Sequence, residues 1–208
     1  MILYKTSKKP IDYLKAISFM EKYALAVAEN KKPELLWFLE HNSVYTAGSS
    51  FEKNDIINNN INIVNTNRGG KITYHGIGQR IIYPIIKLHN KDIKKYIYNL
   101  EDLIIKTLAN FNIKSYRKKD FIGIWVDHNN EDKKIAAIGV HIKKWVAYHG
   151  VAININTNLS FFDNIVPCGI DNFKVTSLSE LGYNITYEQF DEKLKQNFNN
   201  ILLQNNTI

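Results

Sequence analysis

The only cysteine of the chain, Cys168, is the residue whose type and setting best suit covalent chemistry. It stands between Pro167 and Gly169, a pair typical of a turn, and a turn can present the sulfur to a pocket. A thiol is a useful nucleophile where a nearby cation or base favours the thiolate; otherwise a lone cysteine is usually a small buried hydrophobe. Lysines are plentiful, but the sequence alone places none of them beside Cys168.

A second candidate is the glycine-rich segment 68–79, RGGKITYHGIGQ. Its four glycines are costly for folding unless the backbone needs positive φ angles or must approach a ligand closely. The segment is neither a P-loop nor a dinucleotide-binding fingerprint, because Ile72 follows Lys71 and the spacing G-x-G-x-x-G is absent. It predicts either a ligand-binding backbone or a plain glycine-rich hairpin with a cation beside it.

Two strand-like segments, 134–140 and 148–154, carry side chains that are small for the core of a sheet. Small residues on a strand leave room for something else to pack there. Lys134, which begins the first segment, is either a solvated lysine at a strand end or a functional cation. His149, in the second, suits a base, a hydrogen-bond anchor or a satisfied core residue. The six histidines lack the spacing of a metal site, so no metal is expected.

The chain of 208 residues suits a single domain spanning 1–208 and is long enough to bury a large core. One cysteine excludes an internal disulfide framework and a cysteine-rich zinc site. No apolar run approaches the roughly 18 residues that span a bilayer. The N-terminus has no apolar signal core. We therefore expect a soluble, cytoplasmic protein with no membrane partner.

The charge is strongly positive, with 27 Lys and Arg against 20 Asp and Glu and a formal net charge of +7. Such a surplus favours acidic partners. Lys, Ile and Asn are all abundant and share AT-rich codons, so a biased genome explains the charge equally well. The basic residues are scattered and no RNA- or DNA-binding motif is visible, which argues against nucleic acid.

Apolar periodicity predicts three helices, at 14–27, at 93–111 and from about Tyr187 to Ile201. Thr186 and Gln189 have the spacing of a capping box at the start of the third. Strands are predicted at 35–40, 61–64, 71–75, 80–88, 121–126, 135–142 and 146–156, with a turn at 127–133. Runs of strands, rather than strict βαβ alternation, indicate an α+β fold with a mixed sheet.

Four blocks resemble, in order and spacing, the octanoyltransferases of lipoate biosynthesis, also called lipoyl(octanoyl) transferases or the lipoate-protein ligase B family. They are LEHNSVYTAG at 39–48, the glycine-rich segment 68–79, the segments 134–139 and 148–154, and PCG at 167–169 followed by VTSL at 175–178. The resemblance covers about residues 35–181. Two departures, Ile77 in place of a proline and Arg80 at an often apolar position, touch no nucleophile.

The resemblance implies a fold similar to the biotin/lipoate protein ligase catalytic domain: α+β, with a mixed, mostly antiparallel sheet flanked by helices. It also implies the reaction, in which octanoyl passes from acyl carrier protein to a lysine of a lipoyl domain, the first step of endogenous protein lipoylation. Cys168 is the implied nucleophile, which carries the octanoyl group as a thioester. Lys134 is the implied cation that favours the thiolate and the base for the incoming lysine.

The implied acyl site takes in the glycine-rich segment and the small residues of both later strands. Tyr74 and His75 are expected to orient the carbonyl, with backbone N–H groups as an oxyanion hole. The implied substrate-binding residues are Arg68, Gly69, Gly70, Lys71, Ile72, Thr73, Tyr74, His75, Ala137, Ile138, Gly139, Gly150, Val151 and Ala152.

No cofactor is implied, because the thioester is already activated and octanoyl-phosphopantetheine arrives on the acyl carrier protein. The implied partners are acyl carrier protein, the lipoyl domains of 2-oxoacid dehydrogenase complexes and the glycine cleavage H protein, and a monomer is expected. One alternative is an ATP-dependent lipoate-protein ligase, against which the Pro-Cys-Gly block argues. Another is an octanoyl amidotransferase that moves the acyl group between carrier domains.

Overall fold

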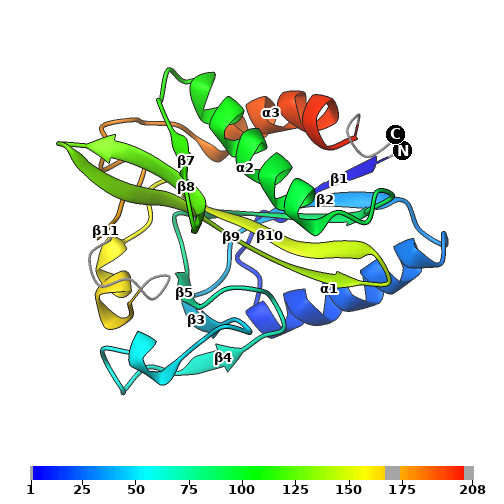
Figure 1. Cartoon of the computed structure of the whole chain (residues 1–208), viewed down its shortest axis with the longest axis horizontal. Helices are drawn as coiled ribbons and strands as arrows, with labels where there is room; N and C mark the ends of the chain where they lie inside the picture. The colour runs from blue at the N-terminus through cyan, green and yellow to red at the C-terminus, as the bar shows by residue number, and fades with distance from the viewer. Residues whose placement is uncertain (1, 167–173, 204–208) are drawn as a thin grey trace.

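The computed structural model describes residues 2–166 and 174–203, so the candidate nucleophile Cys168 lies outside the described residues. Two sheets and three α-helices make up the fold (Figure 1). The larger sheet has eight strands and the smaller has three. All pairs in the path of the larger sheet are antiparallel except β1 with β2. The predicted α+β class with a mixed, mostly antiparallel sheet is confirmed.

The larger sheet runs in the order β1 (Ile2–Thr6), β2 (Glu34–Leu39), β6 (Gln79–Lys87), β10 (Val146–Asn154), β9 (Glu131–Lys143), β8 (Phe121–His128) and β7 (Tyr116–Lys118). The short strand β11 (Lys174–Val175) pairs in parallel with β9. Every residue of β10 is buried, and so is every residue of β6 up to Ile86, as expected of central strands covered on both faces. The smaller sheet has the order β4 (Ile63–Asn65), β3 (Val44–Ala47), β5 (Ile72–His75).

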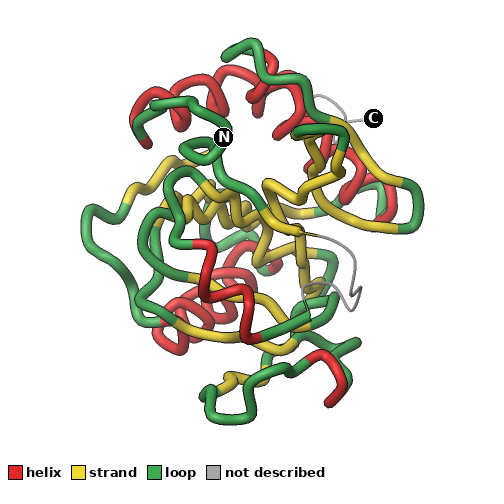
Figure 2. Tube along the Cα trace, turned by 90° about the vertical axis from the view of Figure 1, so that its left-hand side faces the viewer, coloured by secondary structure: helices red, strands yellow, loops and turns green. Residues whose placement is uncertain are grey.

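The helices cover both faces of the larger sheet (Figure 2). α1 (Tyr13–Ala28) packs on one face, while α2 (Ile93–Ala109) and α3 (Tyr187–Phe198) pack together on the other. The predicted capping box of α3 is present, and Asp92 caps α2 by accepting from the Lys95 N–H at 2.9 Å. Short 3₁₀ turns lie at Lys53–Asp55 and Leu159–Asn164, and a π-helical turn follows α3 at Asn199–Leu203.

The apolar stripe of α2 fills the core as its spacing predicts, except at its N-terminal end. Leu100, Ile104 and Leu108 are fully buried, and each such side chain contributes about 1.5–3 kcal/mol of burial free energy. Ile93 is instead 39% exposed. The first turn of α2 therefore carries an apolar residue that the core does not cover.

The predicted turn at 127–133 is wrong. β8 continues to His128 and β9 begins at Glu131, which leaves only Asn129 and Asn130 in the turn, both at positive φ. A two-residue turn of asparagines suits a tight hairpin. The charged residues that suggested a loop lie instead on a solvated hairpin that projects beyond the core.

Candidate active site

A cavity of about 410 Å³ lies where the two sheets meet, and its size is that of a small-molecule site. It contains every predicted substrate-binding residue except Tyr74, together with the predicted catalytic Lys134. Residues outside the predicted substrate-binding set complete its lining: Tyr13, Tyr83, Ile93, Ile97, Asp120, Phe121, Ile122, Val140 and His149. Of these, only His149 was a candidate functional residue from the sequence, and it was not assigned to the acyl site.

The free edge of β9 forms the middle of the cavity. β8 pairs with β9 only as far as Ala136, so the outer edge of β9 beyond that residue is not covered by β8. The glycine-rich loop takes over farther along, where the Gly69 N–H donates to the Val140 carbonyl at 2.9 Å. The cavity occupies the gap between these two attachments, with Ala137, Ile138 and Gly139 in its lining.

Arg68 holds the glycine-rich loop in shape. Its side chain is buried, and its guanidinium donates to the Gly69, Lys71 and Thr46 carbonyls at 3.1, 3.0 and 2.7 Å, and to the Thr46 hydroxyl at 2.8 Å. These bonds tie the loop to β3. Gly70, at φ +89°, supplies the turn that brings the loop back under the guanidinium. Arg68 lines the cavity, but these donors point at protein backbone.

The small residues of β9 and β10 face one another in register, Ala137 with Ala152 and Gly139 with Gly150. A Cβ on Gly139 would lie 3.0 Å from the Gly69 carbonyl oxygen, and one on Gly150 only 2.4 Å from the Ile82 carbonyl oxygen. Close backbone packing therefore requires glycine at 150, whereas a side chain at 139 would force the glycine-rich loop to shift by a small distance. Ala137, which is half-buried, is the lining position where a larger side chain would probe the cavity itself.

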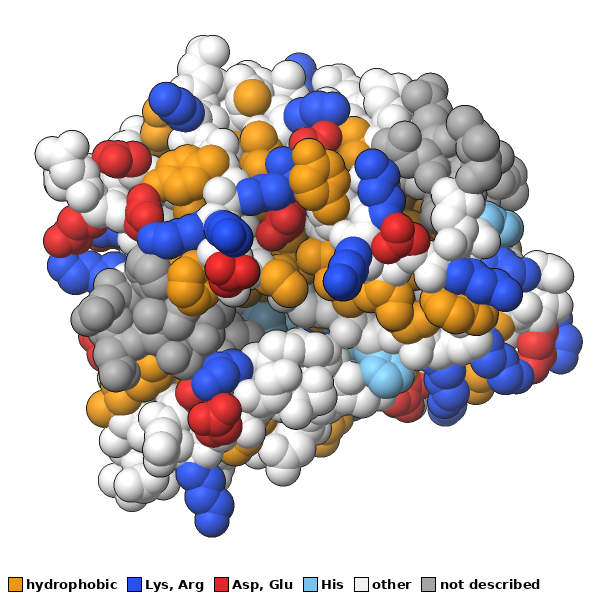
Figure 3. Space-filling view, in the orientation of Figure 1, with side chains coloured by type: hydrophobic (Ala, Val, Ile, Leu, Met, Phe, Trp, Pro, Cys, Tyr) orange, Lys and Arg blue, Asp and Glu red, His pale blue; other side chains and the backbone are white. Residues whose placement is uncertain are grey.

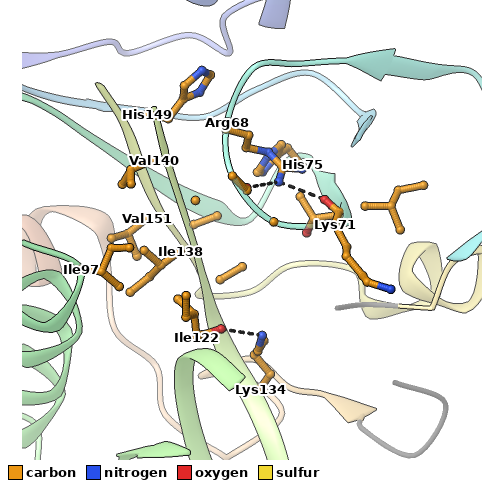
Figure 4. Close-up of a pocket in the computed structure, with 18 of the residues that line it drawn as sticks. Arg68, Lys71, His75, Ile97, Ile122, Lys134, Ile138, Val140, His149 and Val151 are labelled. Atoms are coloured by element: carbon orange, nitrogen blue, oxygen red, sulfur yellow. Dashed lines mark hydrogen bonds between the residues drawn. The ribbon is translucent and has the colours of Figure 1, made fainter. Parts of the chain in front are cut away.

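Lys134 lies at one end of the cavity with only 5% of its surface exposed. Its Nζ donates to the Ile122 carbonyl at 2.9 Å, as Figure 4 shows, and lies 4.9 Å from the centre of the Trp125 ring. Gly123 makes the room, since a Cβ there would stand 3.2 Å from Nζ. A buried amino group fixed beside a cavity is well placed to act on a reacting group that enters it.

The chain returns to Lys134 immediately after the part that is not described. Val175 pairs with Lys134, and the Thr176 N–H donates to the Lys134 carbonyl at 2.9 Å. On the other side of the gap, the Val166 N–H donates to the Asp55 carbonyl at 2.8 Å. The residues flanking 167–173 are thus anchored to β9 on one side and to the 3₁₀ turn after β3 on the other.

His75 is oriented by a chain of side-chain amides. Its Nδ1–H donates to Gln79 Oε1 at 2.7 Å, Gln79 Nε2 donates to Asn154 Oδ1 at 2.9 Å, and Asn154 Nδ2 donates to the Thr176 carbonyl at 2.9 Å. Because an amide oxygen only accepts, this network fixes the proton on Nδ1 and leaves Nε2 as an acceptor. The same Thr176 backbone contacts Lys134, so one network joins the two residues.

Three buried histidines, His75 and His149 in the cavity lining and His41 behind them, are uncharged at neutral pH. Burial lowers the pKa of His41 to about 4 and that of His149 to about 3, and holds the pKa of His75 well below its ordinary value. The Arg68 cation further lowers the pKa values of His149 and His75. Tyr13 stacks on His75 at 5.6 Å, and the Tyr83 hydroxyl donates to His41 Nε2 at 2.8 Å. This end of the cavity is a wall of neutral, aromatic groups.

Tyr74 does not reach the cavity. Side chains alternate along β5, so Thr73 and His75 face the cavity while Tyr74 points into the core of the smaller sheet. Its ring stacks on Phe161 at 4.6 Å. Tyr74 is therefore the one predicted substrate-binding residue outside the cavity lining, and its role in orienting a substrate carbonyl stays a prediction.

Comparison with known proteins places the chain in a family. The model of the lipoyl protein ligase A/B catalytic domain matches residues 12–199. The chain belongs to that family. The relative named "Octanoyltransferase" from Ehrlichia canis is 45% identical over 205 residues, which cover 97% of this chain and 96% of the relative. The protein of the same name from Rickettsia bellii is 47% identical over 204 residues, or 95% and 98% of the two chains. The resemblance to octanoyltransferases and the expectation of an acyltransferase are confirmed.

Solved structures share the fold at much lower identity. The bi-partite lipoate protein ligase of Thermoplasma acidophilum superposes with a TM-score of 0.74 at 14% identity, over 98% of this chain and 84% of that one. A lipoate-protein ligase A bound with ATP gives 0.69 at 15% identity over the same shares. The predicted likeness to lipoate-protein ligase catalytic domains is confirmed. No helix among the described residues is long and apolar enough to cross a membrane.

Proposed function

We propose that this protein transfers octanoyl from acyl carrier protein to a specific lysine of lipoyl domains, as the first step of endogenous protein lipoylation in the cytoplasm. The observation that carries the proposal is the buried Lys134 amino group at the end of an apolar-walled cavity, in a chain 44–47% identical to proteins named octanoyltransferase. A fold shared with lipoate-protein ligases also supports a role in protein lipoylation.

The reaction proceeds in two balanced steps. The Cys168 thiolate attacks the octanoyl thioester carbonyl, a new carbon–sulfur bond forms, and the bond to the phosphopantetheine sulfur breaks. The leaving thiolate takes its proton from the Lys134 ammonium, which becomes the neutral amine. The ε-amine of the acceptor lysine then attacks the acyl-enzyme, an amide forms, and the Cys168 thiolate is released. Lys134 stabilises the thiolate while it is an ammonium, and as the neutral amine it accepts the proton that the acceptor lysine loses.

The cavity suits an eight-carbon chain. Ile97 of α2 and Ile138 and Val151 of the sheet supply apolar walls, and they gather on the same side of the cavity in Figure 4. Burial of the acyl methylenes contributes about 0.8 kcal/mol each. The Ile138 backbone lies at the uncovered edge of β9, and backbone N–H groups there and in the glycine loop suit a developing oxyanion.

We further propose that no cofactor takes part, because a thioester supplies its own activation. The direct test is transfer from octanoyl-acyl carrier protein to a purified lipoyl domain without ATP, with the product amide read by mass spectrometry. We expect full transfer by the wild type and none by Cys168→Ser. Transfer that requires ATP and free octanoate, or a fully active Cys168→Ser protein, would contradict the proposal.

The same assay separates the two rivals. An ATP-dependent lipoate-protein ligase consumes ATP with free octanoate or lipoate, whereas the proposed enzyme leaves ATP untouched. An amidotransferase takes octanoyl from an octanoylated carrier domain in which it is bound as an amide. The proposed enzyme needs a thioester donor, so replacing that donor by such an amide donor should abolish its transfer activity.

A further inference from the structure

The excess positive charge is concentrated on one side of the cavity. The stretch 88–120, which holds α2 and β7, carries eight Lys and Arg against four Asp and Glu. The stretch 44–78, which forms the opposite wall, carries three Lys and Arg against two Asp and Glu. In Figure 3, Lys and Arg side chains, with Asp and Glu side chains between them, follow the upper margin of the hollow, while the lower margin is mostly uncharged. Codon bias alone predicts no such asymmetry.

Three of the four acidic groups of this side are already occupied, and the fourth, Asp120, is exposed beside Lys119. Asp102 pairs with Arg117 at 2.9 Å and with Lys106 at 3.0 Å, and Glu101 pairs with Arg117 at 3.2 Å. Asp92 is held at the start of α2 as its N-cap. The remaining lysines are therefore poorly neutralised from within the protein.

Lys94 and Lys119 are the two cations of this side that stand nearest in sequence to exposed lining residues of the cavity. Both are exposed, and no carboxylate of the described residues lies within 4.0 Å of either amino group. Lys94 follows Ile93, which is 39% exposed, and Lys119 precedes the loop to Ile122, which is 52% exposed. Both isoleucines line the cavity. An apolar centre with a charged margin is the anatomy of a protein–protein interface.

Ile122 links this surface to the chemistry. Its side chain is exposed at the rim, while its carbonyl accepts the hydrogen bond from Lys134 Nζ at 2.9 Å. A partner that covers Ile122 therefore sits directly over the end of the cavity where Lys134 lies. A flexible arm from such a partner would enter the cavity beside the buried amino group.

We propose that the first turn of α2 and the segment 119–122 form the docking surface for the protein that delivers the acyl thioester, a small protein with a carboxylate-rich surface around its thioester-bearing arm. The proposal rests on the proposed function. Lys94 and Lys119 attract the acidic donor, and Ile93 and Ile122 form the apolar contact at its centre. Charge complementarity of this kind speeds encounter and weakens with salt.

The experiment compares two donors, octanoyl-acyl carrier protein and the small thioester octanoyl-pantetheine, with one lipoyl-domain acceptor. The test variant is Lys94→Glu/Lys119→Glu. The control, Lys22→Glu/Lys32→Glu, makes the same charge change on exposed residues at and just after α1, which packs on the other face of the sheet. We expect the test variant to raise KM for the protein donor about tenfold or more and to make that KM less dependent on salt than in the wild type. Its transfer from octanoyl-pantetheine and the control's transfer from both donors should be unchanged.

Each other outcome overturns the docking surface. An equal loss in the control assigns the effect to net charge. If the test variant loses transfer from octanoyl-pantetheine as well, the two substitutions act on the cavity. If it loses transfer from octanoyl-coenzyme A as much as from the protein donor, the two lysines bind an anionic small molecule. A raised KM for the lipoyl domain alone makes this the acceptor's surface. Wild-type protein that transfers octanoyl from neither donor overturns the proposed function, and the docking proposal with it.

Discussion

The two walls of the cavity are built in opposite ways. The wall of the glycine-rich loop is held by backbone contacts and by the buried guanidinium of Arg68, and it packs tightly against Gly139. The wall of α2 and the start of β8 is apolar and partly exposed, with lysines at its margin. The first wall fixes the shape of the cavity, and the second is the surface that contacts substrates as they bind from solution. Substitutions in the first should therefore damage the fold, and those in the second should change substrate affinity.

Arg68→Met should have the largest effect on the first wall. It removes the guanidinium donor from the Gly69, Lys71 and Thr46 carbonyls, of which Lys71 keeps the Gly48 N–H, so we expect the free energy of unfolding to fall by about 3–5 kcal/mol. Urea denaturation measures the loss, and octanoyl transfer should fall with it. Arg68→Lys is the matched control, because it keeps the charge but not the fork of donors. Wild-type stability in Arg68→Lys would show that charge, and not the hydrogen-bond geometry, holds the loop.

The neutral histidines behind the first wall predict acid sensitivity. Their folded pKa values lie below the unfolded value of about 6.5, at about 4 for His41 and about 3 for His149. The unfolded chain therefore binds more protons below pH 6.5, and stability present above that pH is lost as pH falls. Each histidine should contribute a slope of about 1.4 kcal/mol per pH unit below pH 6.

His149→Asn isolates one of these slopes. His149 has φ 61°, a left-handed conformation that asparagine tolerates. As the pH falls from 7 to 5, this variant should lose less stability to urea unfolding than the wild type, with a difference that grows by about 1.4 kcal/mol for each pH unit below pH 6. Parallel curves for the two proteins would show that His149 is protonated without cost in the folded state.

Ile97→Ala tests the second wall. Ile97 is half-buried on α2, so its truncation should cost only about 1–2 kcal/mol of stability. The same change should raise KM for octanoyl donors several-fold and leave kcat nearly unchanged, with a smaller effect on hexanoyl donors. Steady-state kinetics with both chain lengths measure this. A fall in kcat with KM unchanged would place Ile97 outside the acyl contact.

Lys71→Met should have the smallest effect of the four. Lys71 pairs with Asp55 at 3.2 Å, but its side chain keeps a quarter of its exposure, so solvent screens the pair. We expect a change in unfolding free energy of no more than about 1 kcal/mol. Thermal melts beside Arg68→Met give the comparison. A loss of stability as large as that of Arg68→Met would mean that the partly exposed Lys71 stabilises the loop as much as the buried Arg68 does.

Long periodic elements could be predicted from the sequence, and short or non-local ones could not. The stripe of α2 and the capping box of α3 are local signals, and both were predicted correctly. β1, β3, β7 and β11 were missed, because strands of two to five residues depend on pairing with distant partners. Ile93 was predicted as core since periodicity does not show where the sheet beneath a helix ends.

Residues of the site were likewise predicted where a sequence motif marks them and missed where none does. The glycine-rich loop, the small residues and Lys134 were predicted to be neighbours through the family resemblance, and they line one cavity. Tyr74 was included because it lies within the motif, although strand alternation turns it away. Tyr13 and Tyr83 have no signal in the sequence that distinguishes them from ordinary core aromatics. The pairing of Lys134 with Cys168 stays a prediction, because residues 167–173 lie outside the described part of the chain.

The most direct test of the central claim is peptide mapping after the protein is mixed with an octanoyl thioester in the absence of acceptor. We predict one octanoyl group, on Cys168, formed rapidly by the wild type and much more slowly by Lys134→Ala. Octanoyl found on another residue, or no adduct at all in a protein that transfers normally, would contradict a cysteine-linked intermediate. Equal rates of adduct formation and of turnover in the wild type and Lys134→Ala would remove Lys134 from the chemistry.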